Sequence, residues 1–431
     1  MPERRSLGDF LSLMALSGWR RRGKDARSLD LIEACRRLLG EAGEVEGMVL
    51  ALEILDQVEE MSPDDALSFF QGVVSEFAID PDQLRAAIDA WDPADRDSAR
   101  MIHSASEPPS QELIRRLNRV PGATARLVAM RGQLLTLLRG NPDLHGLDAD
   151  FQHLFSSWFN RGFLEIRRID WSTPAAILEK IIAYEAVHEI TGWDDLRQRV
   201  ADPDRRLFAF FHPAMPADPL IFVEVALVAE IPSAIAPILD QDRDRTNPAE
   251  ANVAVFYSIS NCQAGLRGIS FGNFLIKQVV TELQRELKGL DCFVTLSPVP
   301  GLRRWVEQGD NAERILGAET HAMLAGLNDD QRPEPQMARE IAARYLTEAR
   351  RTSGTVFDPV AHFHLGNGAV LHRIHAEADL SRRGIRNSWG VMVNYLYDGD
   401  KIETNHQAYA TDRTIAASGA VRSLAIKKKK G

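Results

Sequence analysis

Cysteine is scarce in this sequence, and the few that occur form no recognisable pattern. The 431 residues include three cysteines, Cys35, Cys262 and Cys292, which lie far apart. Such spacing offers neither a disulfide framework nor the paired ligands of a zinc site. It is typical of a protein from a reducing compartment.

The sequence also lacks a long apolar run and an excess of positive charge. Its longest apolar stretch, residues 220–239, is interrupted by Glu224, Glu230 and two prolines, so no segment is predicted to span a membrane. The formal net charge of −10 argues against a nucleic-acid partner. The arginine-rich N-terminus contains Glu3 and Asp9, whereas mitochondrial presequences are poor in acids. We therefore expect a cytoplasmic protein.

The chain does contain enough apolar material, 45% of its residues, for two or three domains. Ser62-Pro63 and Asp80-Pro81 each place an N-cap residue before a first-turn proline, and both precede residues at helical spacing. No metal or nucleophile pattern accompanies these helices. Residues 1–160 are predicted to be a helical bundle that supports the protein or mediates oligomer contacts.

From residue 161 to 431 the pattern changes to a mixture of strands and helices. Up to residue 295 the predicted order is β-α-α-β-β-β-α-β, followed by a helical insertion at 303–350 that resembles a lid or buttress. Two strands at 369–375 and 391–397 and a final helix at 412–426 complete the prediction. The fold class is α+β with two domains, the first all-α and the second built on a mixed sheet.

The stretch from Asn252 to Gly301 contains the strongest ligand-binding pattern. A strand is followed by a turn with Gly265, Gly268 and Gly272 and then by an amphipathic helix. Glycines allow close backbone approach to a ligand, and the free N–H groups of a helix start favour a phosphate. The spacing matches neither the dinucleotide fingerprint nor a P-loop, so glycines that serve only helix packing remain an equal alternative.

Two residue types could supply chemistry. Ser297 follows a predicted strand in a proline-stiffened loop, where α/β domains place ligand-facing groups, although serine is also common in turns. Four of the eleven histidines lie between 362 and 375, and His362-x-His364 on a strand would place both rings on one face. Few acids stand at ligand spacing, so we favour one acid–base histidine over a metal site.

Several segments together resemble the malonyl-CoA decarboxylase family. They are Phe210–Pro216, Phe256–Ser260, Gly265–Lys277, Leu296–Gly301 and Phe363–Ala369, in order and at fitting separations. The resemblance implies an N-terminal oligomerisation bundle, giving a homodimer or homotetramer, and a GNAT-like CoA-binding catalytic domain at 161–431. It further implies malonyl-CoA as substrate and no cofactor or metal.

By the same resemblance, Ser297 and His364 fall on the family's catalytic positions, and Tyr397 falls on a supporting tyrosine. Ser258 and Asn367 lie in the matching segments as further supporting residues. Ser270 stands where animal members carry Glu, which puts any role of that carboxylate in doubt here. The CoA-contact loop corresponds to Arg267, Gly268, Ile269, Ser270, Phe271, Gly272 and Asn273.

The implied reaction needs no cofactor, because the carbanion left by CO₂ loss delocalises into the thioester carbonyl. Ser297 is expected to bond the malonyl carboxylate or the enolate, and His364 to supply the proton to C2, although the reverse division is possible. A CoA-dependent N-acyltransferase on the same fold is the first alternative. A zinc hydrolase using the histidines and a non-catalytic CoA-binding scaffold are the others.

Overall fold

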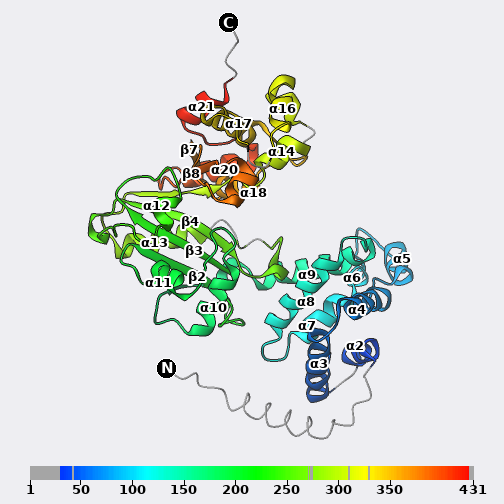
Figure 1. Ribbon diagram of the computed structural model, residues 1–431. Helices are drawn as coiled ribbons and strands as arrows, with labels where there is room; N and C mark the ends of the chain where they lie inside the picture. Colours follow the sequence, from blue (N-terminus) through cyan, green and yellow to red (C-terminus); the bar gives the residue numbers. More distant parts are fainter. Residues whose placement is uncertain are drawn as a thin grey trace. The chain divides into compact units, whose positions relative to one another are not determined.

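The computed structural model describes residues 30–40, 43–269, 271, 275–308, 311–328 and 331–426, and its contacts divide the chain into two compact units (Figure 1). Unit 1 comprises the chain up to Phe163 together with Pro213–Met215 and Gln263–Ser270. Unit 2 comprises Leu164–His212, Pro216–Cys262 and Phe271–Gly431. The short segment Gln263–Ser270 therefore belongs with the helical part, although the strands on either side of it belong to unit 2.

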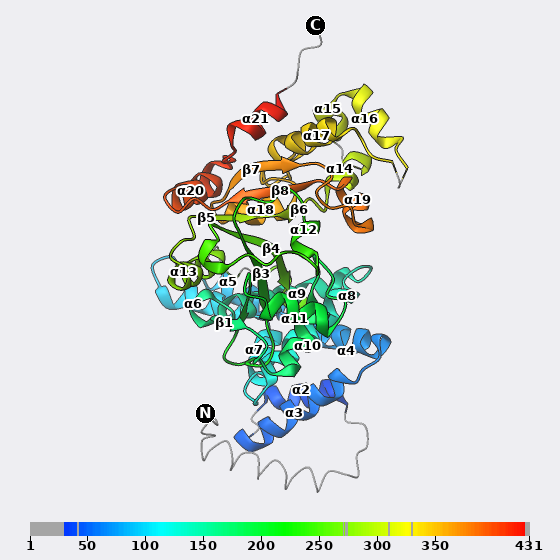
Figure 2. The ribbon, with the colours of Figure 1, turned by 60° about the vertical axis from the view of Figure 1, so that its left-hand side comes forward.

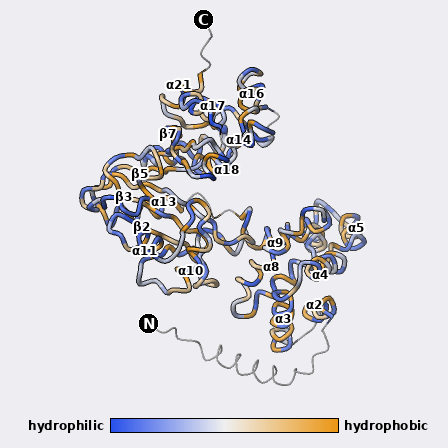
Figure 3. Tube along the Cα trace, in the orientation of Figure 1, coloured by the Kyte–Doolittle hydropathy of each residue, from blue (hydrophilic) through white to orange (hydrophobic). Residues whose placement is uncertain are grey.

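Unit 1 is helical, as the capping signals predict. The hydroxyl of Ser62 and the carboxylate of Asp80 accept hydrogen bonds from the first turns of their helices, each of which opens with proline. In Figure 3 these helices alternate between hydrophobic and hydrophilic stretches, the amphipathic pattern of a bundle. The α-helices are α2 Leu31–Leu39, α3 Glu44–Glu59, α4 Pro63–Glu76, α5 Pro81–Asp89, α6 Arg96–Ala105, α7 Pro109–Leu117, α8 Ala123–Leu137 and α9 His145–Trp158, with the short 3₁₀ turns η1 Pro142–Leu144, η2 Arg161–Phe163 and η4 Ala264–Leu266.

Unit 2 is built on an eight-stranded mixed sheet in the order β1-β2-β3-β4-β5-β8-β6, with β7 paired to β8. Every pairing is antiparallel except that of β4 with β5. The predicted α+β class is therefore confirmed. The predicted order of elements up to β5 is also observed, except that the four-residue helix α12, Ala236–Leu239, lies between β3 and β4. The strands are β1 Glu165–Ile169, β2 Arg205–Phe211, β3 Ile221–Val228, β4 Val253–Asn261, β5 Cys292–Thr295, β6 Ser297–Pro298, β7 Val370–His375 and β8 Met392–Leu396.

Helices cover the sheet of unit 2. Side chains from α10 and α11 pack against β2 and β3 in one apolar cluster, and Figure 2 shows α17 and α21 beside β7, in agreement with their contacts. The helices and 3₁₀ turn are α10 Ala175–Tyr184, α11 Trp193–Ala201, α12 Ala236–Leu239, η3 Pro248–Glu250, α13 Leu275–Glu286, α14 Leu302–Gln308, α15 Ala312–Leu316, α16 Ala318–Ala325, α17 Pro335–Glu348, α18 Pro359–Gly366, α19 Arg382–Ser388, α20 Ile402–Asp412 and α21 Gly419–Ala425.

Two predicted helical regions differ in detail from the structure. Within the helical insertion expected at 303–350, the chain breaks at Gly317, whose φ of +89° ends α15 and starts α16. The final helix expected at 412–426 is wrong in its first half. There α20 ends at Asp412, Arg413 adopts a left-handed conformation, and α21 begins only at Gly419.

The sheet opens at the point where the parallel strands β4 and β5 stop pairing with each other. β4 follows β5 only from Val253 to Phe256, whereas its remaining residues up to Asn261 pair with β3. Leu296 still donates its N–H to the carbonyl oxygen of Phe256 in β4 at 3.0 Å, and Ser297 then pairs with β8 instead. A gap beside the carboxyl end of a parallel strand is where α/β sheets commonly bind ligands.

Candidate active site

Ser297 lies at the point where β5 parts from β4. Its side chain is buried, with 6% of the residue exposed. The Ser297 hydroxyl donates to Oγ1 of Thr295 at 2.8 Å, and Oγ1 also accepts the backbone N–H of Tyr395 at 3.1 Å. The serine is therefore held by the sheet rather than by a flexible loop.

His364 reaches Ser297 from helix α18, with its Nε2 atom 3.1 Å from the Ser297 Oγ atom. The strand geometry that the disfavoured metal site would need at His362-x-His364 is absent, because both residues lie on α18. Asp358 caps the helix and Pro359 opens it, the same start signal that correctly predicted α5. Residues two apart on a helix do not face each other, and His362 contacts the Tyr409 hydroxyl instead, at 2.8 Å from its Nδ1.

Tyr397 completes a linear array with the other two side chains. Its hydroxyl lies 2.8 Å from His364 Nδ1, and the Tyr395 ring stacks on the imidazole at 4.5 Å between centroids. Because the Ser297 hydroxyl donates to Thr295, Nε2 of His364 is left to donate to Ser297, and Nδ1 then accepts from Tyr397. The network thus fixes one tautomer, with its proton directed at Ser297.

Burial controls the charge of this array. Desolvation lowers the pKa of His364 to about 3 and raises the pKa of Tyr397 well above its ordinary value. Both groups are therefore neutral at neutral pH. An added negative charge in the same low-dielectric space would raise the pKa of His364, so the imidazole is responsive to an anionic ligand.

Ser297 and His364 line a cavity of about 270 Å³ that is partly open to solvent. Its lining contains no charged side chain, and most of the walls are aliphatic, aromatic or proline surfaces. The lining residues are Val187, Ile221, Phe256, Tyr257, Ser258, Ile259, Asn261, Ser297, Pro298, Pro359, Val360, Phe363 and His364.

The two predicted supporting residues lie in different surroundings. Ser258 lines the cavity, and its hydroxyl donates to the carboxylate of Glu185 at 2.8 and 2.9 Å. Asn367 is buried at the end of α18, where its amide donates to the carbonyl oxygen of Phe363 at 2.7 Å. Its observed contact is a helix-end contact rather than one with the cavity.

The glycine turn is placed by the helices of unit 1. A side chain on Gly265 would bring Cβ within 1.8 Å of the carbonyl oxygen of Val128 in α8. The expectation that Gly265 serves close approach to a ligand is therefore wrong, because its missing side chain makes room for a helix backbone. Gly268, in contrast, is exposed and has a φ of +83°.

Arg131 fixes the carbonyl groups of this turn. Its side chain is 1% exposed, and the guanidinium pairs with Asp148 at 2.8 Å. It also donates to the carbonyl oxygens of Gly265 at 2.6 Å and Arg267 at 2.9 Å. Of the predicted CoA-contact residues, Arg267 is exposed while Ile269 and Phe271 are buried. Ser270, Gly272 and Asn273 lie outside the described residues.

The histidines between 362 and 375 do not converge. His375 contacts the Asn394 side-chain oxygen at 2.6 Å, whereas His364 contacts Ser297 and Tyr397. Within the described ranges, no group of three or more His, Cys, Asp or Glu side chains is placed to hold a metal ion.

The sequence did not reveal the role of Asp358, which connects the helix of His364 to the loop after Ser297. Asp358 is fully buried, and its carboxylate accepts the N–H groups of Val360 and Ala361 and the Tyr345 hydroxyl. Gly301, from the loop after Ser297, adds a backbone hydrogen bond, and desolvation raises the pKa of Asp358 to about 6. The Asp358-Pro359 pair was a signal for this helix cap, but nothing local indicated the bond to Gly301.

Comparison with known proteins assigns the chain to a family. A model of the malonyl-CoA decarboxylase C-terminal domain matches residues 162–431, and a model of the N-terminal domain matches residues 77–159. The chain belongs to the malonyl-CoA decarboxylase family. The family expected from the sequence is thereby confirmed, and the N-acyltransferase alternative is not favoured.

Individual members of the malonyl-CoA decarboxylase family agree with this assignment. The mitochondrial malonyl-CoA decarboxylase of Anser anser anser is 35% identical over 355 residues, covering 74% of this chain and 69% of the relative. The crystal structure of malonyl-CoA decarboxylase from Rhodopseudomonas palustris has a TM-score of 0.87 and 47% identity, covering 91% of this chain and 98% of that one. The structure from Agrobacterium vitis has a TM-score of 0.85 and 49% identity, covering 92% and 100%.

Proposed function

We propose that the chain is a carboxy-lyase that converts malonyl-CoA into acetyl-CoA and CO₂ without a cofactor. The observation that carries the proposal is the array in which Ser297, His364 and Tyr397 are hydrogen-bonded at the wall of an uncharged cavity. The thioester carbonyl accepts the electron pair released by CO₂ loss, so the protein has only to position, polarise and protonate.

The uncharged cavity favours loss of the carboxylate. A carboxylate is strongly stabilised by water, whereas the CO₂ that leaves is neutral. Among the lining residues no lysine or arginine replaces the lost hydration. Transfer into this cavity therefore raises the free energy of the malonyl carboxylate more than that of a transition state in which the charge is moving into the thioester.

The array then stabilises the enolate oxygen and protonates C2. We assign the Ser297 hydroxyl as donor to the enolate oxygen, a contact of the oxyanion-hole type that contributes about 3 kcal/mol per donor. His364 gives a proton to C2. As CO₂ leaves, the negative charge that develops on the enolate raises the pKa of His364, so the imidazole takes up a solvent proton at this stage and passes it to C2, while Tyr397 holds the ring in place.

For the CoA end of the substrate we propose the turn from Arg267 to Asn273. Arg267 is exposed, and Arg131 fixes its carbonyl group from the buried side. An exposed guanidinium beside a positive-φ glycine suits a pyrophosphate group.

We also propose that the chain self-associates through its helical part, as a homodimer or homotetramer, and acts in the cytoplasm. Large apolar side chains are exposed on and beside α5 and α6, with Ile88 52%, Trp91 55% and Met101 54% exposed. No helix in the described parts of the chain is long and apolar enough to cross a bilayer. Light scattering of Trp91→Ser against the unsubstituted chain tests the oligomer, and an unchanged mass would place the contact elsewhere.

The decisive experiment is incubation with malonyl-CoA in D₂O, with acetyl-CoA and CO₂ measured together. We expect equimolar products and one deuterium in the new methyl group, because C2 is protonated after CO₂ leaves. The addition of an amine acceptor should change nothing. If malonyl-CoA is returned intact, or free malonate and CoA appear, the proposal is wrong.

A further inference from the structure

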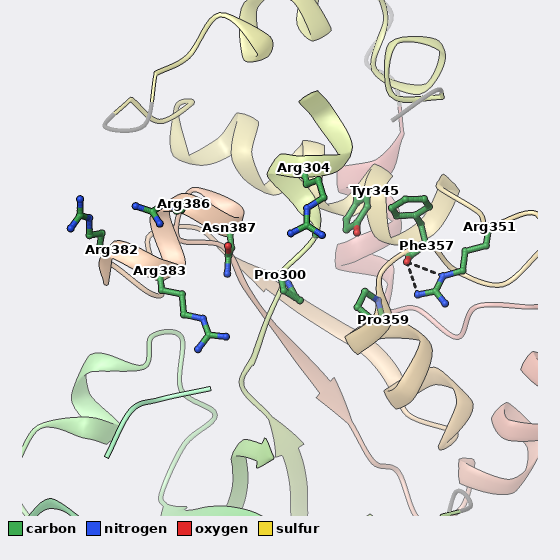
Figure 4. Close-up of a pocket in the computed structure, with 11 residues that line it drawn as sticks. Pro300, Arg304, Tyr345, Arg351, Phe357, Pro359, Arg382, Arg383, Arg386 and Asn387 are labelled. Carbon is green, nitrogen blue, oxygen red and sulfur yellow. Dashed lines mark hydrogen bonds between the residues drawn. The ribbon is translucent and has the colours of Figure 1, made fainter. Parts of the chain in front are cut away.

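A second hollow in unit 2 adjoins the catalytic cavity and is strongly basic. It has a volume of about 770 Å³ and lies among α14, α19 and the start of α18 (Figure 4). It shares Pro359 with the catalytic cavity, and Pro300 and Gly301 connect it along the chain to Ser297. We call it the arginine pocket, after the five residues Arg304, Arg351, Arg382, Arg383 and Arg386 in its lining.

These arginines differ from the buried arginines of the same protein. Arg131, Arg199 and Arg206 each pair with a carboxylate within 3.3 Å. In the arginine pocket, by contrast, none of the five guanidinium groups forms an ion pair with a carboxylate of the described residues. Arg351 donates to the carbonyl oxygen of Phe357, and Arg383 donates to that of Ala186.

Five cations gathered without carboxylates repel one another, and a bound anion would relieve this repulsion. The chain as a whole carries a formal net charge of −10, so the local excess does not follow from composition. In Figure 4 the side chains of α19 lie on one side of Arg304, and Tyr345, Arg351 and Phe357 lie on the other.

The size and chemistry of the pocket distinguish among anions. The malonyl carboxylate is bonded to C2, which must meet His364 in the catalytic cavity, so that carboxylate cannot also occupy a hollow of 770 Å³ beyond Pro359. Guanidinium groups bind phosphate in a bidentate manner. The partly exposed Phe357 ring and Pro359 add an apolar surface of the kind that a nucleobase can cover.

We propose that the arginine pocket binds the phosphate groups of a nucleotide. The ligand is a free nucleotide that acts on the enzyme from this site, separate from the substrate. This goes beyond the proposed function, which places the pyrophosphate of the substrate on the turn at Arg267.

Calorimetry with adenosine 3′,5′-bisphosphate tests the binding without requiring turnover. Arg304→Gln and Arg386→Gln come from two different helices, and both side chains are exposed, so the fold should be retained. We expect each change to weaken binding about tenfold, and the double change about a hundredfold. Arg386→Lys should keep part of the affinity, and Arg422→Gln, an exposed arginine on α21, should keep all of it.

Absence of binding at millimolar ligand would overturn the proposal. So would binding that the double variant retains, or that only Arg267→Gln removes. Kinetics then identify the source. If the double variant loses kcat/KM for malonyl-CoA but not for malonyl-pantetheine, the pocket holds the nucleotide end of the substrate itself, and the proposal of a separate nucleotide is overturned. If adenosine 3′,5′-bisphosphate changes kcat without competing with malonyl-CoA, the ligand is a separate nucleotide.

Discussion

The catalytic cavity and the arginine pocket are neighbours in unit 2 that meet at Pro359, yet they treat charge in opposite ways. The cavity is small and has no charged side chain in its lining. The pocket is almost three times larger and gathers five arginines. Each environment suits a different task, because a reacting carboxylate gains from losing its hydration, whereas a group that only has to be held gains from charge pairing.

The same contrast explains the state of His364. Burial in the uncharged cavity lowers its pKa to about 3, so the free site contains no resident cation that would stabilise the substrate carboxylate. The wall between the two hollows is formed by the start of α18 and the loop after Ser297, and Asp358 ties these two segments together.

The largest effect should follow from the array itself. His364→Gln removes the proton donor to C2, and we expect kcat for acetyl-CoA formation to fall by about 10²–10⁴-fold with KM little changed. His362→Gln, on the other side of the same helix, is the matched control and should retain most activity. Near-normal turnover by His364→Gln would show that another group protonates the enolate.

Removal of the Asp358 carboxylate, which connects the start of α18 to the loop after Ser297, should have the next largest effect. Asp358→Ala leaves the cap of α18, the Tyr345 hydroxyl and the Gly301 N–H without their acceptor. We expect a loss of about 3 kcal/mol in the free energy of unfolding, together with reduced kcat. Asp80→Ala removes an exposed cap in unit 1 and should lower the free energy of unfolding less than Asp358→Ala does, without affecting kcat. Equal losses in both variants would mean that Asp358 acts only as a cap.

The pH dependence of stability reports directly on the burial of His364. Its folded pKa of about 3 lies below the ordinary value of 6.5, so the unfolded chain binds more protons between these limits. Its contribution is fully present above pH 6.5 and is lost as the pH falls towards 3. From pH 7 to pH 5 the unsubstituted chain should lose about 2 kcal/mol relative to His364→Gln in urea unfolding. A constant difference between the two proteins would contradict the buried neutral imidazole.

The smallest effect should come from making the cavity resemble the pocket. Val360→Lys introduces a cation into the first turn of α18, where Val360 is partly exposed and lines the cavity. The cation would stabilise the substrate carboxylate more than the transition state, so we expect kcat to fall about tenfold while KM falls or stays constant. Val360→Met is the uncharged control. A rise in kcat for the lysine variant would refute the desolvation argument.

Much of the fold could be predicted from local signals. The Ser62-Pro63 and Asp80-Pro81 caps located α4 and α5, and the alternation of residue types located the order of elements from β1 to β5. The Asp358-Pro359 pair is the same start signal, but no helix was predicted for α18. The helix α20 was missed, and the final helix was predicted to begin at Asp412, where α20 ends and Arg413 adopts a left-handed conformation.

The candidate site was predictable to a smaller degree. The resemblance to the family identified Ser297, His364 and Tyr397, which lie together in the structure although their roles stay predictions. The function of Gly265 could not be derived locally, because it depends on the carbonyl of Val128, far away in the sequence. The arginine pocket could not be found for a similar reason, since its residues come from four separate stretches of the chain.

The position of Gln263–Ser270 within unit 1 has a consequence for biosynthesis. Arg131 and Asp148 are buried, and the guanidinium finds its carbonyl partners in Gly265 and Arg267, over 130 residues later. During translation, the helices of unit 1 are therefore synthesised long before the segment that accepts hydrogen bonds from Arg131. We expect these helices to remain loosely packed during that interval and to mature only after about two thirds of the chain has been translated.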